Sequence, residues 1–93
     1  MVKSNLQFLN VENIPIGDGA TIYLSQMRKL NAIAIGSTKI TARGVERLLV
    51  NEKLRTIMYV PTAEFTAVDA LILTKRHPNC KFLNKYQKGD SLM

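Results

Sequence analysis

The apolar positions of the chain recur at a regular interval. A segment starting at Leu6 (LQFLNV) returns at Leu30 (LNAIAI) and again, after the same interval, at Leu54 (LRTIMY), and a degraded fourth start follows after a slightly longer interval at Cys80 (CKFL). Repetition at a fixed period of this length is typical of stacked architectures in which each repeat is one supersecondary unit. The pattern predicts three repeats and a remainder, with boundaries near 6–29, 30–53, 54–79 and 80–93.

Each repeat combines two hydrophobic periods. At its start, apolar residues alternate with period two, which predicts a short strand with one buried face. The inward positions of these strands are Leu9, Val11, Ile33, Ile35, Ile57 and Tyr59. After a threonine or glycine, the spacing changes to that of an amphipathic helix. The helical apolar positions are Ala20, Leu24, Met27, Val45, Leu48, Leu49, Ala70 and Leu73.

Local signals predict where the helices begin and end. Thr41 and Thr66 are good N-cap residues, and Thr66 forms a capping-box pattern with the aspartate three positions later. Pro78 predicts that the third helix ends near Arg76 or His77, because the residue before a proline avoids the helical conformation.

A single repeat cannot bury its own apolar edge, so neighbouring repeats are expected to stack with their strands in parallel. A chain of 93 residues is long enough for one domain only, so we predict a single domain, 1–93. We therefore predict an α/β fold: a short right-handed β/α solenoid with a parallel sheet and about three and a half repeats.

Two segments carry a resemblance to a known family. LNAIAIGSTKITARGVERLL (30–49) and LRTIMYVPTAEFTAVDALILTKRHPNCKF (54–82) are similar to the unit L-x-x-L-x-L-x-x-T-x-I/V-T-x-x-G-V/L-x-x-L and to the ending L-P-N-C-K. The chain thus resembles leucine-rich repeat proteins of the cysteine-containing or ribonuclease-inhibitor-like kind. Tyr59 departs from the unit at its third apolar strand position, Asp69 stands where the middle repeat has Gly44, and the first repeat lacks both threonines. The resemblance implies a recognition subunit, as in ubiquitin-ligase receptors or the assembly of mitochondrial complexes.

The side chains between the inward strand positions point to the opposite face of the sheet, and this set is unusually apolar for a surface. Contiguous exposed apolar patches usually mark interaction sites. The alternative interpretation is that the small side chains are filler or that the tail folds over them. The predicted partner-binding residues are Phe8, Asn10, Ala32, Ala34, Thr56, Met58 and Phe82.

The net charge of +6 is unevenly spread, with −1 over residues 1–27 and +7 over residues 28–93. Such an excess favours an anionic partner, whether nucleic acid, an acidic protein or a membrane surface. A solvated face that keeps the domain soluble is the simpler interpretation, and few aromatic residues stand among the charges to stack on bases. The predicted basic patch consists of Arg28, Lys29, Arg43, Arg47, Lys53, Arg55, Lys75, Arg76 and Lys81.

The sequence completes no catalytic or metal-binding set. His77 and Cys80 have workable spacing, but a structural zinc site needs four ligands and the chain has one histidine and one cysteine. The segment Gly36-Ser-Thr-Lys39 lacks the spacing of a phosphate-binding loop. Neither paired carboxylates nor a nucleophile with a base can be assigned. We expect no enzymatic activity, no cofactor and no metal.

The predicted function is that of a non-catalytic protein-binding or scaffold module, a subunit of a larger assembly. A basic nucleic-acid-associated protein is the alternative. The end repeats are poor caps, and exposed strand edges favour self-association. A single cysteine, an interrupted apolar start and no long apolar run predict an intracellular protein without a membrane span. The cytoplasm is the default compartment, and a mitochondrial address stays open.

Overall fold

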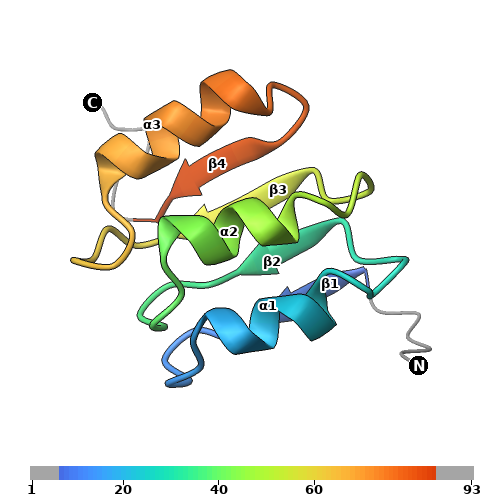
Figure 1. The fold of residues 1–93 in the computed structure, drawn as a ribbon, viewed down its shortest axis with the longest axis horizontal. Coiled ribbons are helices and arrows are strands. Elements are labelled where there is room, and N and C mark those ends of the chain that lie inside the picture. Colours follow the sequence, from blue (N-terminus) through green and yellow to red (C-terminus); the bar gives the residue numbers. More distant parts are fainter. Residues whose placement is uncertain (1–6, 86–93) are drawn as a thin grey trace.

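The computed structural model describes residues 7–85, in which strands and helices alternate along the chain (Figure 1). The elements are β1 (Phe8–Asn10), α1 (Asp18–Leu24), β2 (Ala32–Ala34), α2 (Ala42–Leu48), β3 (Thr56–Tyr59), α3 (Ala67–Arg76) and β4 (Lys81–Asn84). The predicted α/β class is confirmed.

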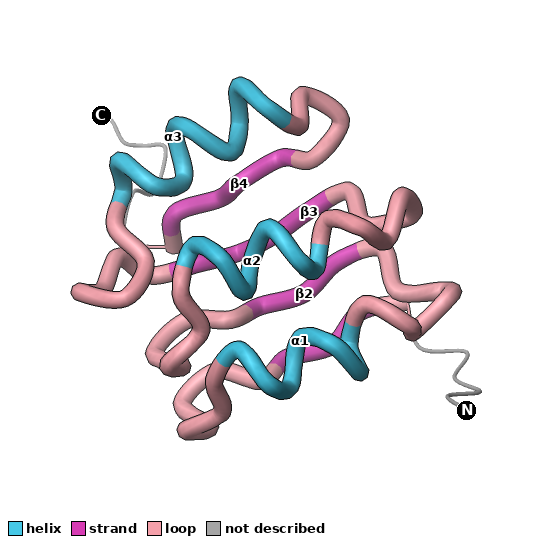
Figure 2. The backbone as a smooth tube through the Cα atoms, in the orientation of Figure 1, coloured by secondary structure: helices cyan, strands magenta, loops and turns pink. Residues whose placement is uncertain are grey.

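The strands form one parallel sheet whose order, β1-β2-β3-β4, is the order of the chain. Phe8 lies opposite Ala32, and Ala32 lies opposite Thr56, so equivalent positions of successive repeats pair with one another. Figure 2 shows the helices as a second layer that follows the strands. The parallel pairing and the alignment of the first three strands are therefore as predicted.

The register of β4 differs from the prediction. Alignment of Cys80 with Leu54 would place Phe82 opposite Thr56, but the residue opposite Thr56 is Lys81. This shift by one position places Phe82 opposite the buried Ile57, and Phe82 packs against the core. Leu83 takes the outward position instead and is 43% exposed. The prediction that Phe82 belongs to the outer face is wrong.

An aromatic cluster explains why Phe82 turns inward. The rings of Phe65 and Phe82 are stacked with centroids 6.4 Å apart, and Phe65 meets Tyr59 edge to face at 5.3 Å. Both separations lie in the range in which aromatic pairs add to the stability gained by burial. The large ring of Phe82 thus fills the last part of the core.

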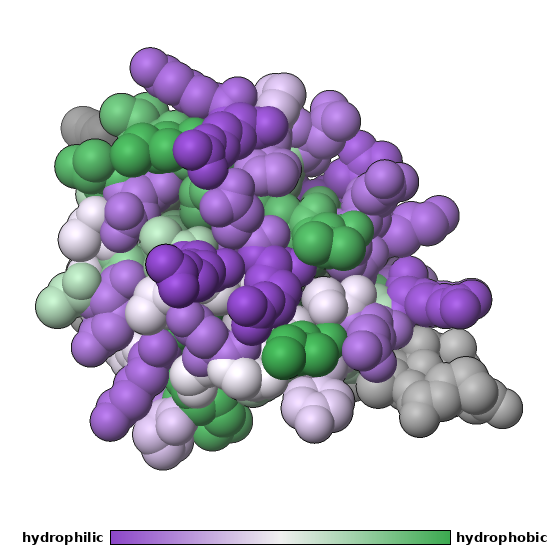
Figure 3. Space-filling view, viewed as in Figure 1, coloured by the Kyte–Doolittle hydropathy of each residue, from purple (hydrophilic) through white to green (hydrophobic). Residues whose placement is uncertain are grey.

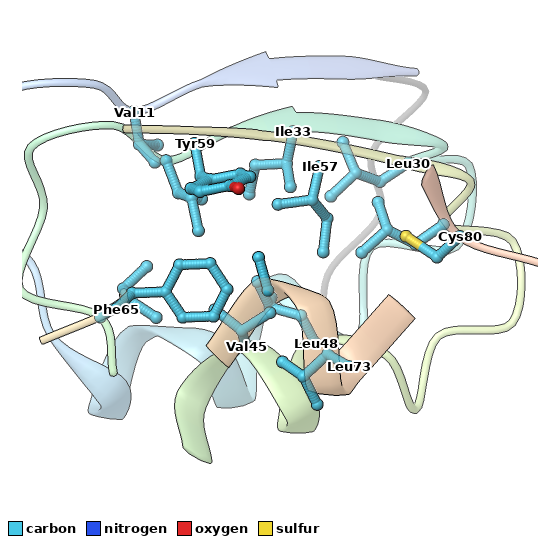
Figure 4. Close-up of a cluster of buried hydrophobic side chains, with 14 of the residues drawn as sticks. Val11, Leu30, Ile33, Val45, Leu48, Ile57, Tyr59, Phe65, Leu73 and Cys80 are labelled. Atoms are coloured by element: carbon cyan, nitrogen blue, oxygen red, sulfur yellow. The ribbon is translucent and has the colours of Figure 1, made fainter. Parts of the chain in front are cut away.

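The core lies between the sheet and the helices, as Figure 4 shows. Ile33, Ile57 and Val45 are fully buried, and Leu48 is 1% exposed. Burying one such side chain contributes about 1.5–3 kcal/mol. All predicted inward strand positions are buried or pack against this core. Met27 is also buried, although α1 already ends three positions earlier.

The predicted helix signals are confirmed. The Thr41 side chain caps α2, and Thr66 forms a reciprocal capping box with Asp69 at the start of α3. An additional contact joins α1 to α2: the Asp18 carboxylate accepts hydrogen bonds from the backbone N–H of Thr41 at 2.8 Å and from its hydroxyl at 2.5 Å. α3 ends at Arg76, before the proline.

Among residues 7–85, no helix has both the length and the apolar character needed to cross a membrane.

Candidate functional site

One face of the sheet is bare in the described part of the chain. The helices α1, α2 and α3 pack on the opposite face, as Figures 1 and 4 show from two directions. We call the bare side the sheet face, and its alternating outward positions follow from the strand registers. Its strand residues are Phe8, Asn10, Ala32, Ala34, Thr56, Met58, Lys81 and Leu83.

The most exposed apolar side chains of the sheet face lie on its two edge strands. Phe8 on β1 is 46% exposed and Leu83 on β4 is 43% exposed. Between them, Ala32, Thr56 and Met58 are partly exposed. The result is a mixed surface with one large apolar side chain on each edge strand, and the exposed or partly exposed polar side chains on it are Asn10, Thr56 and Lys81.

Ala34 does not take part in this surface, contrary to prediction. It is only 1% exposed, yet it is not a member of the core cluster. Its neighbours in register are the longer side chains of Asn10 and Met58, which flank its methyl group on the sheet face. Ala34 therefore offers almost no contact area to a partner. Ala34 and the inward-facing Phe82 are the two predicted partner-binding residues that do not contribute to the exposed sheet face.

A polar boundary, not anticipated from the sequence, closes one end of the sheet face. The Lys85 ammonium lies 2.8 Å from a Glu12 carboxylate oxygen, so an ion pair joins the chain just beyond β1 to the chain just beyond β4. Gly36 lies between them: a Cβ there would approach Val60 Cγ2 to 2.8 Å and Glu12 Oε2 to 3.2 Å. The glycine makes room for the glutamate to reach across the sheet.

The nine predicted basic residues are spread over several elements of the fold, and four of them meet at one depression. Arg28 and Lys29 in the turn after α1, and Lys53 and Arg55 in the turn after α2, surround an open depression of about 540 Å³. We call this site the basic depression, and Gln7 and Asn31 complete its lining. The other five predicted cations lie outside it, on α2 (Arg43, Arg47), on α3 (Lys75, Arg76) and on the sheet face (Lys81).

The two turns of the basic depression are tied together. The Asn51 side chain donates a hydrogen bond to the carbonyl of Met27 at 3.0 Å and accepts one from the N–H of Lys53 at 3.0 Å. The N–H of Arg55 donates to the carbonyl of Asn31 at 2.7 Å. These contacts fix the backbone from which the cationic side chains project.

A second depression, of about 380 Å³, lies beside the end of α3 and includes His77 and Cys80 in its lining. Burial raises the pKa of the Cys80 thiol from 9.0 to about 11, so the thiol is neutral at physiological pH. His77 Nε2 lies 3.8 Å from a Glu46 oxygen that also pairs with Arg76 at 2.9 Å. No three histidine, cysteine or acidic side chains among residues 7–85 come together in a way that could hold a metal ion.

The outward side of α3 carries an apolar patch that the sequence reasoning missed. Val68, Leu71 and Ile72 are 64%, 57% and 47% exposed. Hydrophobic surface is visible over α3 in the upper left of Figure 3, on a side that is otherwise largely hydrophilic. The available signal was that Leu71 and Ile72 fall between the inward positions Ala70 and Leu73, and that Val68 lies just before them.

Apart from the α3 patch, two adjoining surfaces stand out, the bare sheet face and the basic depression next to it. The depression borders the first row of the sheet face, because Gln7, Asn31 and Arg55 each directly precede a strand residue of that row. The chain matches no family model, no curated protein and no solved structure. Its function is therefore inferred from the chemistry of these two surfaces.

Proposed function

We propose that the chain is a non-catalytic protein-binding module, a subunit of a larger assembly, and that its partner lies on the sheet face. The observation that carries this proposal is the bare side of a parallel sheet. Parallel sheets are normally covered on both faces, because their crossover helices pack on both sides. Here the helices of residues 7–85 cover one side only, and the other side exposes Phe8 and Leu83.

We further propose that the fold is a short right-handed β/α solenoid of the leucine-rich-repeat type. The strand order equals the chain order, and each strand pairs with the corresponding strand of the next repeat. Stacked repeats of this kind form an extended sheet surface, and repeat proteins use such surfaces for binding. The fold proposal and the binding proposal support each other, but they rest on different observations.

Substitution of Met58 by glutamate tests the binding proposal. Met58 is half-buried in the centre of the sheet face, so a carboxylate there disrupts an apolar contact without opening the core. Val50→Glu is the matched control, because Val50 is 74% exposed and lies after α2, away from the sheet face. We expect quantitative affinity capture from native lysate to show a protein retained by the wild type and by Val50→Glu, and depleted at least tenfold with Met58→Glu.

The circular dichroism spectra of both variants should match that of the wild type. Equal retention of every captured protein by Met58→Glu and Val50→Glu would exclude the sheet face as the binding surface.

A further inference from the structure

We infer that the basic depression binds an acidic peptide segment, rich in aspartate or glutamate, of the partner protein. This inference rests on the proposed function, because it assigns chemistry to the partner that lies on the sheet face. It concerns a different set of residues, however, and it can fail separately.

The first support is uncompensated charge. Arg28, Lys29, Lys53 and Arg55 are all exposed around one depression, and no acidic side chain of residues 7–85 lines it. Glu52 is close in sequence, but it lines the second depression, to which Arg55 also contributes, and no ion pair joins Glu52 to Arg55. Among residues 7–85, the acidic groups that form ion pairs are bound elsewhere, to Arg76 and Lys85, and none pairs with these four cations.

The second support is spacing. The two turns belong to neighbouring repeats, so the backbone positions that carry their cations are about one strand spacing, roughly 5 Å, apart. Like charges gathered around one depression repel one another, and the repulsion is relieved when carboxylates bind between them. Arginine and lysine can both donate to carboxylate oxygens, and the arginine fork can do so with two parallel hydrogen bonds.

The third support is a preformed backbone. Asn51 bonds to the carbonyl of Met27 and to the N–H of Lys53, and so holds both turns in one arrangement. Asn31 is held in turn by the carbonyl of Gln7, through a hydrogen bond of 2.9 Å. Less ordering is needed on binding when the groups that carry the charges are already fixed.

A peptide fits the depression better than a nucleic acid does. Single-stranded nucleic acids are bound by cations interleaved with aromatic side chains on which bases stack. No aromatic side chain lines the depression, and Phe8 is the one exposed ring on the sheet face within residues 7–85. A protein that binds duplex DNA with strong salt dependence makes about six to ten phosphate contacts, whereas this depression presents four cations. The peptide continues onto the adjoining sheet face, where the rest of the partner lies.

A fluorescein-labelled oligoglutamate peptide is the probe, and its binding to the full chain is measured by fluorescence anisotropy at low salt. The test variant is Lys53→Gln/Arg55→Gln, and the matched control is Arg43→Gln/Lys75→Gln, which removes one arginine and one lysine outside the depression. We expect Kd to rise at least tenfold in the test variant and no more than about twofold in the control. All four positions are exposed, and matching circular dichroism spectra confirm that both variants fold.

Four outcomes would overturn the inference. The first two are wild-type affinity in the test variant and no binding to the wild type. The third is an equal loss in both variants, which would mean that net charge alone attracts the peptide. The fourth is tighter binding of an oligouridylate of equal charge, which would identify a nucleic-acid site. If oligoglutamate binds as expected while Met58→Glu still captures every protein that the wild type captures, the sheet-face proposal fails and the basic depression stands.

Discussion

Gly44 on α2 lies beside the Asp18 carboxylate, which leaves no room for a larger residue. A Cβ at this position would overlap the Asp18 carboxylate and come within 3.0 Å of Ile40 Cγ2. That carboxylate is needed where it is, because it accepts both hydrogen bonds from Thr41 at the start of α2. A negative charge at a helix N-terminus is also favourable in itself. The glycine thus allows α1 and α2 to be joined through a short polar contact.

Gly44→Ala should therefore destabilise the chain, although alanine is the better helix former. The gain in helix propensity is about 1 kcal/mol, whereas each displaced hydrogen bond to the carboxylate is worth about 1.5–3 kcal/mol. We expect a net loss of roughly 1–3 kcal/mol in the free energy of unfolding, measured by urea denaturation. In an Asp18→Ala background the same substitution should be neutral or stabilising. An equal cost in both backgrounds would show that Asp18 is not the reason for the glycine.

At the scale of elements, α3 begins in the most complete cap of the described chain. The Thr66 hydroxyl accepts from the N–H of Asp69 at 3.1 Å, and the Asp69 carboxylate accepts from the N–H of Thr66 at 2.9 Å. Both of these N–H groups would lack a partner within the helix. The cap fixes where α3 starts, and so it aligns Ala70 and Leu73 with the core.

Thr66→Ala should lower the free energy of unfolding by about 1 kcal/mol, because it leaves the Asp69 N–H without its capping partner. Thr74→Ala is the matched control on the same helix: Thr74 is exposed, and its hydroxyl bonds to the carbonyl of Ala70 one turn earlier. That change should stay within about 0.5 kcal/mol of the wild type. Urea denaturation followed by far-ultraviolet circular dichroism compares the two, and equal effects would show that the cap has no special role.

The sequence predicts the ends and the buried faces of an element correctly where a single local pattern determines them. Thr66 and Pro78 marked the ends of α3, and alternation identified the inward faces of β1, β2 and β3. The repeat pattern aligns Cys80 with Leu54 and so predicts the wrong register for β4. The observed register brings Phe82 into contact with Phe65, and hydrophobic periodicity alone does not reveal such a contact. Periodicity assigns a side chain to a face without saying what lies beside it.

The same limitation applied to the candidate sites. Ala34 was placed on the correct face of the sheet, but its burial depends on the side chains on the neighbouring strands. The basic depression could not be separated from the other cations until Lys53 and Arg28 were seen in adjoining turns. In both cases the missing information was contact between residues one repeat apart.

At the scale of the whole molecule, most contacts join neighbouring strands or neighbouring helices. The Glu12–Lys85 pair instead joins residues from the first and the last described repeat. Among residues 7–85, it is the side-chain hydrogen bond that joins the two edges of the sheet, across 73 positions of the sequence. Three strand spacings separate these edges, about 14 Å, so both side chains must extend toward each other over Gly36. The Glu12 side chain is only 16% exposed, which reduces the screening of this pair by water.

We expect the pair to couple the first and last described strands by about 0.2–1 kcal/mol, the range for partly exposed ion pairs. Urea unfolding of Glu12→Gln, Lys85→Gln and the double variant gives this coupling as a double-mutant cycle. The coupling should shrink at high salt, because screening weakens the attraction between exposed charges. The Glu46–Arg76 pair, whose side chains are 43% and 60% exposed, provides the comparison and should couple less. A Glu12–Lys85 coupling of zero at low salt would mean that the edges of the sheet are held only by the strands and helices between them.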